Sequence, residues 1–126
     1  MKEVLAIVRM NKIGATKRAL AEAGIPSAHA KECLGRGKGL VDFAVLRGAE
    51  QGYEEAIAHL GSSQRLIPKR MVSIVVPDRL VPATVGAIVR ANQTGKAGDG
   101  KVFVLPVEDS ISIRTGECGD ATLDAS

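Results

Sequence analysis

The chain is short, mildly basic and poor in aromatic side chains. Its 126 residues suit a single compact domain, and a content of 45% hydrophobic and 25% charged residues excludes a globally disordered protein. A net charge of +3 and an aromatic content of 2% disfavour the basic, stacking surface that is typical of nucleic-acid binders, although the slight positive excess suits an anionic ligand.

The cysteines and the N-terminus indicate a reducing compartment. Cys33 and Cys118 show no C-x-x-C spacing and no accompanying histidine pair, so neither a zinc site nor a disulfide framework is indicated. Residues 1–3 lead directly into an apolar segment of about eight residues, which is too short to span a bilayer and lacks a signal-peptide cleavage pattern. We therefore expect a cytoplasmic protein with no membrane span.

The first part of the chain predicts a strand, a helix and a second strand. Residues 4–9 are almost continuously apolar and predict a strand, and helical spacing then predicts a helix over 13–23. The apolar stripe of this helix consists of Ile13, Thr16, Leu20 and Ala23. Gly24 and Pro26 end the helix, and residues 27–34 predict a partly exposed strand because many of them are polar.

A second strand-helix-strand unit follows a long gap. The β-branched run 71–76 predicts a buried strand, and Asp78 is placed to cap a helix that runs to about Asn92, with Pro82 in its first turn. The expected buried face of this helix is Val81, Val85, Ile88 and Val89. Residues 102–105 predict a further strand, and Ile111 with Ile113 suggests a short fifth one.

The order of elements predicts an α+β fold of the ferredoxin-like β-α-β-β-α-β type, as one domain over residues 1–126. The gap between Cys33 and Met71 is longer than most connections and predicts a functional loop. Within it, Tyr53, Ile57 and Leu60 have helical spacing, which fits either packing against the domain or contact with a partner.

Three glycine-containing turns are candidate anion sites. Gly35-Arg36-Gly37-Lys38-Gly39 follows a strand, and its sequence fits either amide contacts to an anion or a hinge at the base of the long loop. Thr94-Gly95-Lys96-Ala97-Gly98-Asp99-Gly100-Lys101 is richer in glycine and lysine and favours phosphate binding over a solvated turn. It is not a P-loop, because Val102 replaces the magnesium-binding hydroxyl and the order is helix, loop, strand. Arg114, beside Gly116, adds a third cationic turn.

Together these turns resemble the signatures of the PII signal-transducer family. Thr94-Gly95-Lys96-x-Gly98-Asp99-Gly100-Lys101-Val102-Phe103 is similar to the family's B-loop, and Arg114-Thr115-Gly116-Glu117 is similar to its C-loop. Met1-Lys2-x-Val4, Arg47-Gly48-Ala49-Glu50 and Ile67-Pro68-Lys69 extend the resemblance to essentially the whole chain. The stretches 35–42 and 64–69 look more like PII-type regulators encoded among nitrogen-fixation genes than like general glutamine-metabolism members.

The resemblance implies a trimer, or a mixed oligomer with a sister paralogue, with ATP or ADP in the clefts between subunits. The long loop, at about residues 35–69, corresponds to the family's target-binding T-loop. Carried over by position, the phosphates would be held by Gly98, Asp99, Gly100 and Lys101 and reached by Arg114. Gly35, Gly37 and Lys38 would line the same cleft, and Lys69 matches the lysine that binds the 2-oxoglutarate carboxylate.

Three positions depart from the common family pattern. The glutamine that helps bind magnesium and 2-oxoglutarate is missing from the turn 35–39, so the resemblance leaves both of these ligands open. Ser112 stands where many members have an arginine, and Gln51 stands where some have a uridylylated tyrosine. Covalent control is therefore not predicted.

We expect a non-catalytic sensor of nitrogen and energy status whose nucleotide selects one conformation of the loop 35–69. The loop would then act on nitrogenase, through its dinitrogenase component, or on another protein of nitrogen metabolism. One alternative is a nucleotide-phosphate hydrolase using Lys96 and Lys101, for which the sequence nominates no base. The other is an RNA-binding ferredoxin-like domain, which the scarcity of strand aromatics disfavours.

Overall fold

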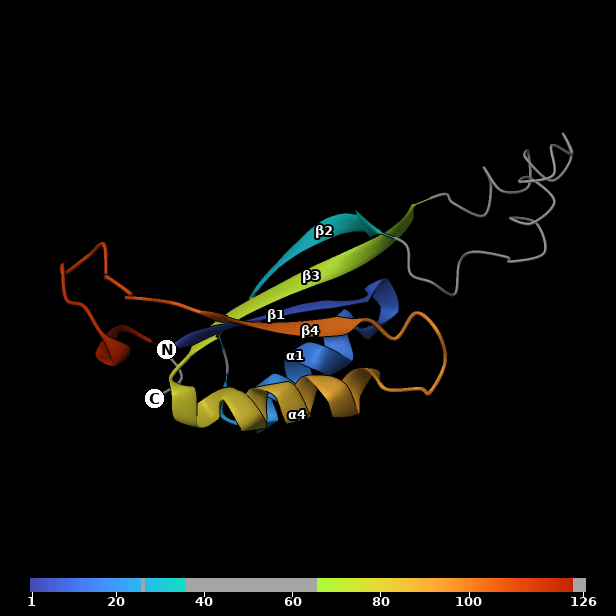
Figure 1. Ribbon diagram of the computed structural model, residues 1–126, viewed down its shortest axis with the longest axis horizontal. Coiled ribbons are helices and arrows are strands. Elements are labelled where there is room, and N and C mark those ends of the chain that lie inside the picture. Colours follow the sequence, from blue (N-terminus) through green and yellow to red (C-terminus); the bar gives the residue numbers. More distant parts are fainter. Residues whose placement is uncertain (26, 36–65, 124–126) are drawn as a thin grey trace, which may run out of the picture.

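Four strands form one antiparallel sheet in the order β2-β3-β1-β4, and two helices lie on one of its faces (Figure 1). The structure is a computed structural model, and it describes residues 1–25, 27–35 and 66–123. The strands are β1 (Lys2–Arg9), β2 (His29–Gly35), β3 (Ile67–Val76) and β4 (Lys101–Pro106). The helices are α1 (Ile13–Glu22) and α4 (Val81–Asn92), with short 3₁₀ helices at Met10–Lys12, Asp78–Leu80 and Asp120–Thr122. The predicted ferredoxin-like α+β fold is confirmed.

The sheet has one buried face and one open face. Residues alternate between the two faces along each strand, and directly paired residues such as Ala6 and Val72 share a face. The helix-covered face supplies most of the core, with Val4, Ala6, Val8, Val72, Ile74 and Val76 all buried. On the other face, Phe103 is 49% exposed, and it pairs with Leu5 of β1. An antiparallel sheet tolerates one exposed face, but an apolar one favours a partner.

The two helices contact each other as well as the sheet. Thr16 and Leu20 of α1 are buried, as its predicted stripe requires. In α4 the predicted face is partly wrong, because Val89 is 41% exposed whereas Thr84, Ala87, Ile88 and Asn92 are buried. Valines occur around much of this helix, so hydrophobicity alone does not identify its contact side. The small residues allow close approach, and the Asn92 amide donates to the Thr16 hydroxyl at 2.9 Å.

Two local predictions are corrected, one just before α4 and one after β4. Asp78 does not cap α4: its carboxylate pairs with the Met1 ammonium at 3.0 Å and with Lys2 at 3.4 Å, and a 3₁₀ helix precedes α4. Pro82 does lie in the first turn of α4. The predicted fifth strand is only a single bridge from Ile111 to Cys118, because the chain turns sharply in between.

The remaining elements differ in their ends or are not described. β3 begins at Ile67, earlier than the predicted start at 71, and β2 is an edge strand with mostly exposed residues, as expected. The predicted short helix around 53–60 and most of the loop 35–69 lie outside the described residues. Within the described ranges, no helix is both long enough and apolar enough to cross a membrane.

Candidate functional site

The glycine-rich turn between α4 and β4 has a backbone that only glycine accepts at its key positions. Gly95, Gly98 and Gly100 all have positive φ, at 83°, 96° and 107°. A Cβ atom on Gly100 would lie 1.9 Å from the carbonyl oxygen of Ile7, so no other residue fits there. The turn, residues 93–100, therefore lies directly against the end of β1.

Asp99 organises this turn from within. Its carboxylate accepts hydrogen bonds from the Thr94 amide at 2.8 Å, the Gly95 amide at 3.0 Å and the Thr94 hydroxyl. The bonds from Thr94, together with the Arg9 guanidinium, hold the pKa of Asp99 well below its ordinary value of 3.8. The side chain of Asp99 is thus occupied inside the turn, and the predicted contact of Asp99 with phosphate stays a prediction that its backbone amide would have to fulfil.

Two cations from neighbouring strands reach the same turn. Arg9, the last residue of β1, donates to Asp99 Oδ1 at 2.7 Å and to the carbonyl oxygen of Ala97 at 3.0 Å. Lys69 pairs with Arg9 in the sheet register, and its Nζ donates to the carbonyl oxygen of Gly98 at 3.2 Å. Sequence reasoning missed Arg9, because only the pairing of β1 with β3 and β4 brings it to the turn.

The last part of the turn has amide groups without a partner among the described residues. Within the described part of the chain, no hydrogen bond occupies the amide groups of residues 98–100. Adjacent free amides in a glycine-rich turn form a concave anion site, and nearby ammonium and guanidinium groups strengthen it. The geometry of the turn therefore suits a phosphate group.

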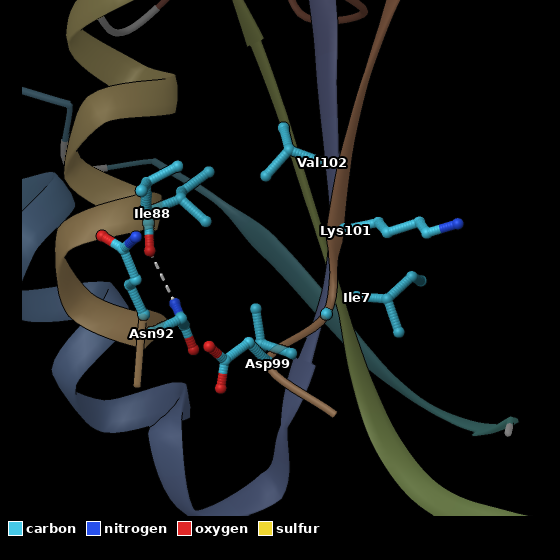
Figure 2. Close-up of a pocket in the computed structure, with 10 residues that line it drawn as sticks. Ile7, Ile88, Asn92, Asp99, Lys101 and Val102 are labelled. Atoms are coloured by element: carbon cyan, nitrogen blue, oxygen red, sulfur yellow. Dashed lines mark hydrogen bonds between the residues drawn. The ribbon is translucent and has the colours of Figure 1, made fainter. Parts of the chain in front are cut away.

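A hollow of about 230 Å³ lies beside the turn, between α4 and the strands β1 and β4. Figure 2 shows Ile88, Asn92 and Val102 on the side of this hollow, whereas the Lys101 and Ile7 side chains point the opposite way. Because strand residues alternate between faces, the Lys101 ammonium belongs to the open face of the sheet, together with Phe103. A ligand that uses both the turn and Lys101 would therefore lie on the open face.

One chain brings together only some of the predicted site residues. Gly35 ends β2 at the same end of the sheet as the turn 93–100, and Lys69 is in contact with that turn. The segment that contains Arg114 follows β4 and leaves the sheet at the opposite end, where Pro106 pairs with Lys2 of β1 (Figure 1). Gly37 and Lys38 lie outside the described residues. A site that includes Arg114 and this turn must therefore combine two copies of the chain.

The region around Arg114 is an exposed turn closed by backbone hydrogen bonds. Its backbone is closed by hydrogen bonds from the Gly116 amide to the Ser112 carbonyl oxygen at 2.7 Å and from the Ser112 amide to the Glu117 carbonyl oxygen at 2.8 Å. Ile113, beside Arg114, is fully exposed. An exposed arginine beside a fully exposed isoleucine combines charge with apolar surface, and such a surface is suited to contact a second chain.

The sequence matches the family described as "Nitrogen regulatory protein P-II" over residues 1–117. It is 43% identical to "Nitrogen fixation nifHD region GlnB-like protein 2" of Methanothermococcus thermolithotrophicus, over 98% of each chain. It is 42% identical to the protein of the same name from Methanococcus maripaludis, over 98% of this chain and 100% of the relative. It is 39% identical to "Nitrogen regulatory protein P-II 1" of Escherichia coli (strain K12), with the same coverage.

The fold and these matches together define a nitrogen regulatory protein of ferredoxin-like architecture. The chain belongs to the PII family. Proteins of this family are regulators rather than enzymes, and the family is known to bind adenine nucleotides. The two nifHD-region relatives named above, at 43% and 42% identity, are slightly more similar to the chain than the Escherichia coli protein at 39%, in agreement with the predicted resemblance to nitrogen-fixation regulators.

Proposed function

We propose that this protein is a non-catalytic, cytoplasmic sensor that binds ATP or ADP and controls a protein of nitrogen fixation through the loop 35–69. The observation that carries the proposal is the turn 93–100, whose amides at 98–100 are unoccupied within the described chain and whose backbone only glycine accepts at Gly100. Such a turn presents donors to a polyphosphate without needing a catalytic base.

The proposed nucleotide site lies between two copies of the chain in a trimer. The turn 93–100 and Lys101 would come from one subunit and Arg114 from its neighbour, because these groups lie at opposite ends of β4 in a single chain. The open apolar face around Phe103 supports the assembly, since burying it removes apolar surface from water. A mixed oligomer with a sister paralogue would form the same kind of cleft.

The proposed signal passes through Lys69 to the loop 35–69. Lys69 lies near the start of β3, where that loop rejoins the sheet, and it contacts the turn through the Gly98 carbonyl oxygen. A nucleotide shifts the loop only if it binds one loop state more tightly than the other. Lys69 is also the proposed contact for 2-oxoglutarate if this ligand binds, with magnesium as a further ligand to be tested.

The proposed target is nitrogenase, at its dinitrogenase component, because the more similar relatives carry names that place them in nitrogen-fixation regions. Purified protein with ADP is expected to lower the activity of this component, and ATP is expected to relieve the inhibition. The control is the same protein with Lys101→Ala, which should not respond to ATP. Unchanged activity with all ligands would direct the search to another nitrogen-metabolism protein.

Calorimetry of ATP and ADP binding tests the central claim. The wild-type oligomer is expected to bind both nucleotides, and Gly100→Ala is expected to lose at least about tenfold in affinity because its Cβ would collide with the Ile7 carbonyl oxygen. Gly14→Ala, on helix α1 with an ordinary contact, is the matched control and should bind as the wild type does. Absence of binding by the wild type, or steady ATPase turnover, would contradict the proposal.

A further inference from the structure

Arg9 is the only side chain from another element that forms an ion pair with Asp99 among the described residues. Its two terminal nitrogens act on different parts of the turn: Nη1 binds the Asp99 carboxylate at 2.7 Å and Nη2 binds the Ala97 carbonyl oxygen at 3.0 Å. A planar guanidinium can hold both groups at once, whereas a lysine ammonium on its flexible stem acts as a point charge. Arg9 therefore joins the turn to the end of β1.

The pairing of β1 with β3 fixes the position of the Arg9 backbone beside the turn. Arg9 is paired in register with Lys69 of β3, and Lys69 holds the Gly98 carbonyl oxygen. Both the Arg9 and Asp99 side chains are about three-quarters buried, with exposed fractions of 25% and 24%. An ion pair at such a site is less screened by solvent than one on the open surface.

Asp99 creates an electrostatic problem for the proposed phosphate site. Its carboxylate stays ionised at neutral pH, because hydrogen bonds from Thr94 and Arg9 lower its pKa. The amide groups offered to phosphate belong to residues 98–100, immediately beside this negative charge. Without compensation, the carboxylate would repel a polyphosphate, and it would repel ATP more than a ligand that carries fewer charges.

We propose that Arg9 is a positioning residue that holds the turn 93–100 in its phosphate-binding conformation and neutralises Asp99 so that polyphosphate can approach. The first part concerns the turn alone. The second part rests on the proposed nucleotide-binding function. Arg9 itself is directed at Asp99 and Ala97, and it acts on the ligand through them.

Two measurements on Arg9→Ala and Arg9→Lys separate these parts. Hydrogen exchange without nucleotide should show faster exchange of the hydrogen-bonded amides of residues 94–96 in both variants, because neither retains the two-point contact that holds Asp99 and the turn. Calorimetry should show that Arg9→Ala loses about tenfold or more in ATP affinity and clearly less in AMP affinity. Arg9→Lys should bring the ratio of ATP to AMP affinity back toward the wild-type value, because it keeps the charge.

Arg18→Ala is the matched control, since it removes the same charge from an exposed position on α1. A double variant distinguishes a loss of charge balance from a loss of folding. Adding Asp99→Asn to Arg9→Ala removes the uncompensated charge, so the double variant should bind ATP more tightly than Arg9→Ala alone.

Wild-type exchange in both Arg9 variants would overturn the positioning role. An equal loss of ATP and AMP affinity in Arg9→Ala, with no rescue by Asp99→Asn, would overturn the charge-balancing role. If the wild-type protein binds no nucleotide, the proposed function fails together with the charge-balancing role, and the exchange comparison still decides whether Arg9 positions the turn.

Discussion

Individual carboxylates in this chain act through partners that are remote in sequence. Asp78 precedes a helix and has the residue type of a cap, yet its carboxylate lies 3.0 Å from the Met1 ammonium. The Met1 side chain is nearly buried, and the Met1 carbonyl oxygen accepts a hydrogen bond from the Val107 amide at 3.2 Å, so the N-terminus is held in place beside Asp78. The Asp78 carboxylate therefore serves as the counter-charge of the ammonium group, and a 3₁₀ helix leads into α4 without a side-chain cap.

The Met1–Asp78 pair predicts a specific acid dependence of stability. Hydrogen bonds from the N-terminus and Lys2 hold the pKa of Asp78 below its ordinary value of 3.8, so its stabilising contribution is complete above about pH 4 and declines as the pH falls toward the folded pKa. Thermal unfolding of Asp78→Asn between pH 7 and pH 2.5 should therefore show a shallower acid decline than the wild type.

Glu22→Gln, on the exposed side of α1, is the control for that experiment and should follow the wild-type curve. A wild-type decline that Asp78→Asn leaves unchanged would show that the Met1–Asp78 pair does not contribute.

At the scale of elements, the contact between α1 and α4 includes a buried polar pair. The Asn92 Nδ2 atom donates to the Thr16 hydroxyl and to the Ile88 carbonyl oxygen, each at 2.9 Å, while its Oδ1 atom has no partner within the described residues. The Thr16 hydroxyl donates in turn to the Lys12 carbonyl oxygen at 2.7 Å. This hydrogen-bond network determines which side of α4 packs against α1. The spacing of apolar residues along the sequence does not predict it.

Removing the Thr16 hydroxyl should destabilise the protein measurably. Thr16→Val leaves Asn92 with one partner fewer in a buried site, so the free energy of unfolding in urea should fall by about 1–3 kcal/mol. The double variant Thr16→Val with Asn92→Leu should recover part of this loss, since no buried polar group is then left unpaired. Val89→Ala, on the exposed side of α4, should cost less than about 1 kcal/mol. A larger effect for Val89 than for Thr16 would contradict the observed orientation of α4.

At the scale of the whole molecule, the described residues leave one face of the sheet uncovered and hold two of the predicted site elements apart. The turn 93–100 precedes β4 and Arg114 follows it, and the sheet face between them carries exposed apolar side chains, including Phe103. A second copy that covers this face could bring its Arg114 to the turn. Oligomerisation and nucleotide binding are therefore expected to be lost together.

Phe103→Asp tests this link. A carboxylate on the open face should disrupt the oligomer, because burying an unpaired charge is costly. Sedimentation should show a smaller species, with circular dichroism unchanged, and ATP affinity should fall in parallel. Ala21→Asp, on an exposed position of α1, is the control and should remain an oligomer that binds ATP. A Phe103→Asp protein that stays an oligomer, or a monomer that binds ATP normally, would refute the intersubunit site.

The sequence by itself determined the four strands of the sheet, the two helices and the position of the glycine-rich turn, although not the single bridge found in place of a fifth strand. Continuous apolar runs predict buried strands, and the predicted glycine-rich turn is needed because the backbone at Gly100 meets the Ile7 carbonyl oxygen. These features depend on local periodicity and on the conformational freedom of single residues, which a sequence displays directly.

The tertiary structure alone decided which partner each of these charged side chains has and how far apart the predicted site residues lie in one chain. Arg9 reaches Asp99 across ninety positions of sequence, and Asp78 reaches Met1 only after β1 and β3 have paired. Arg114 is separated from the turn 93–100 by the length of β4, although it follows that turn closely in sequence. Strand register creates these neighbours, and register is a property of paired strands that no single segment encodes.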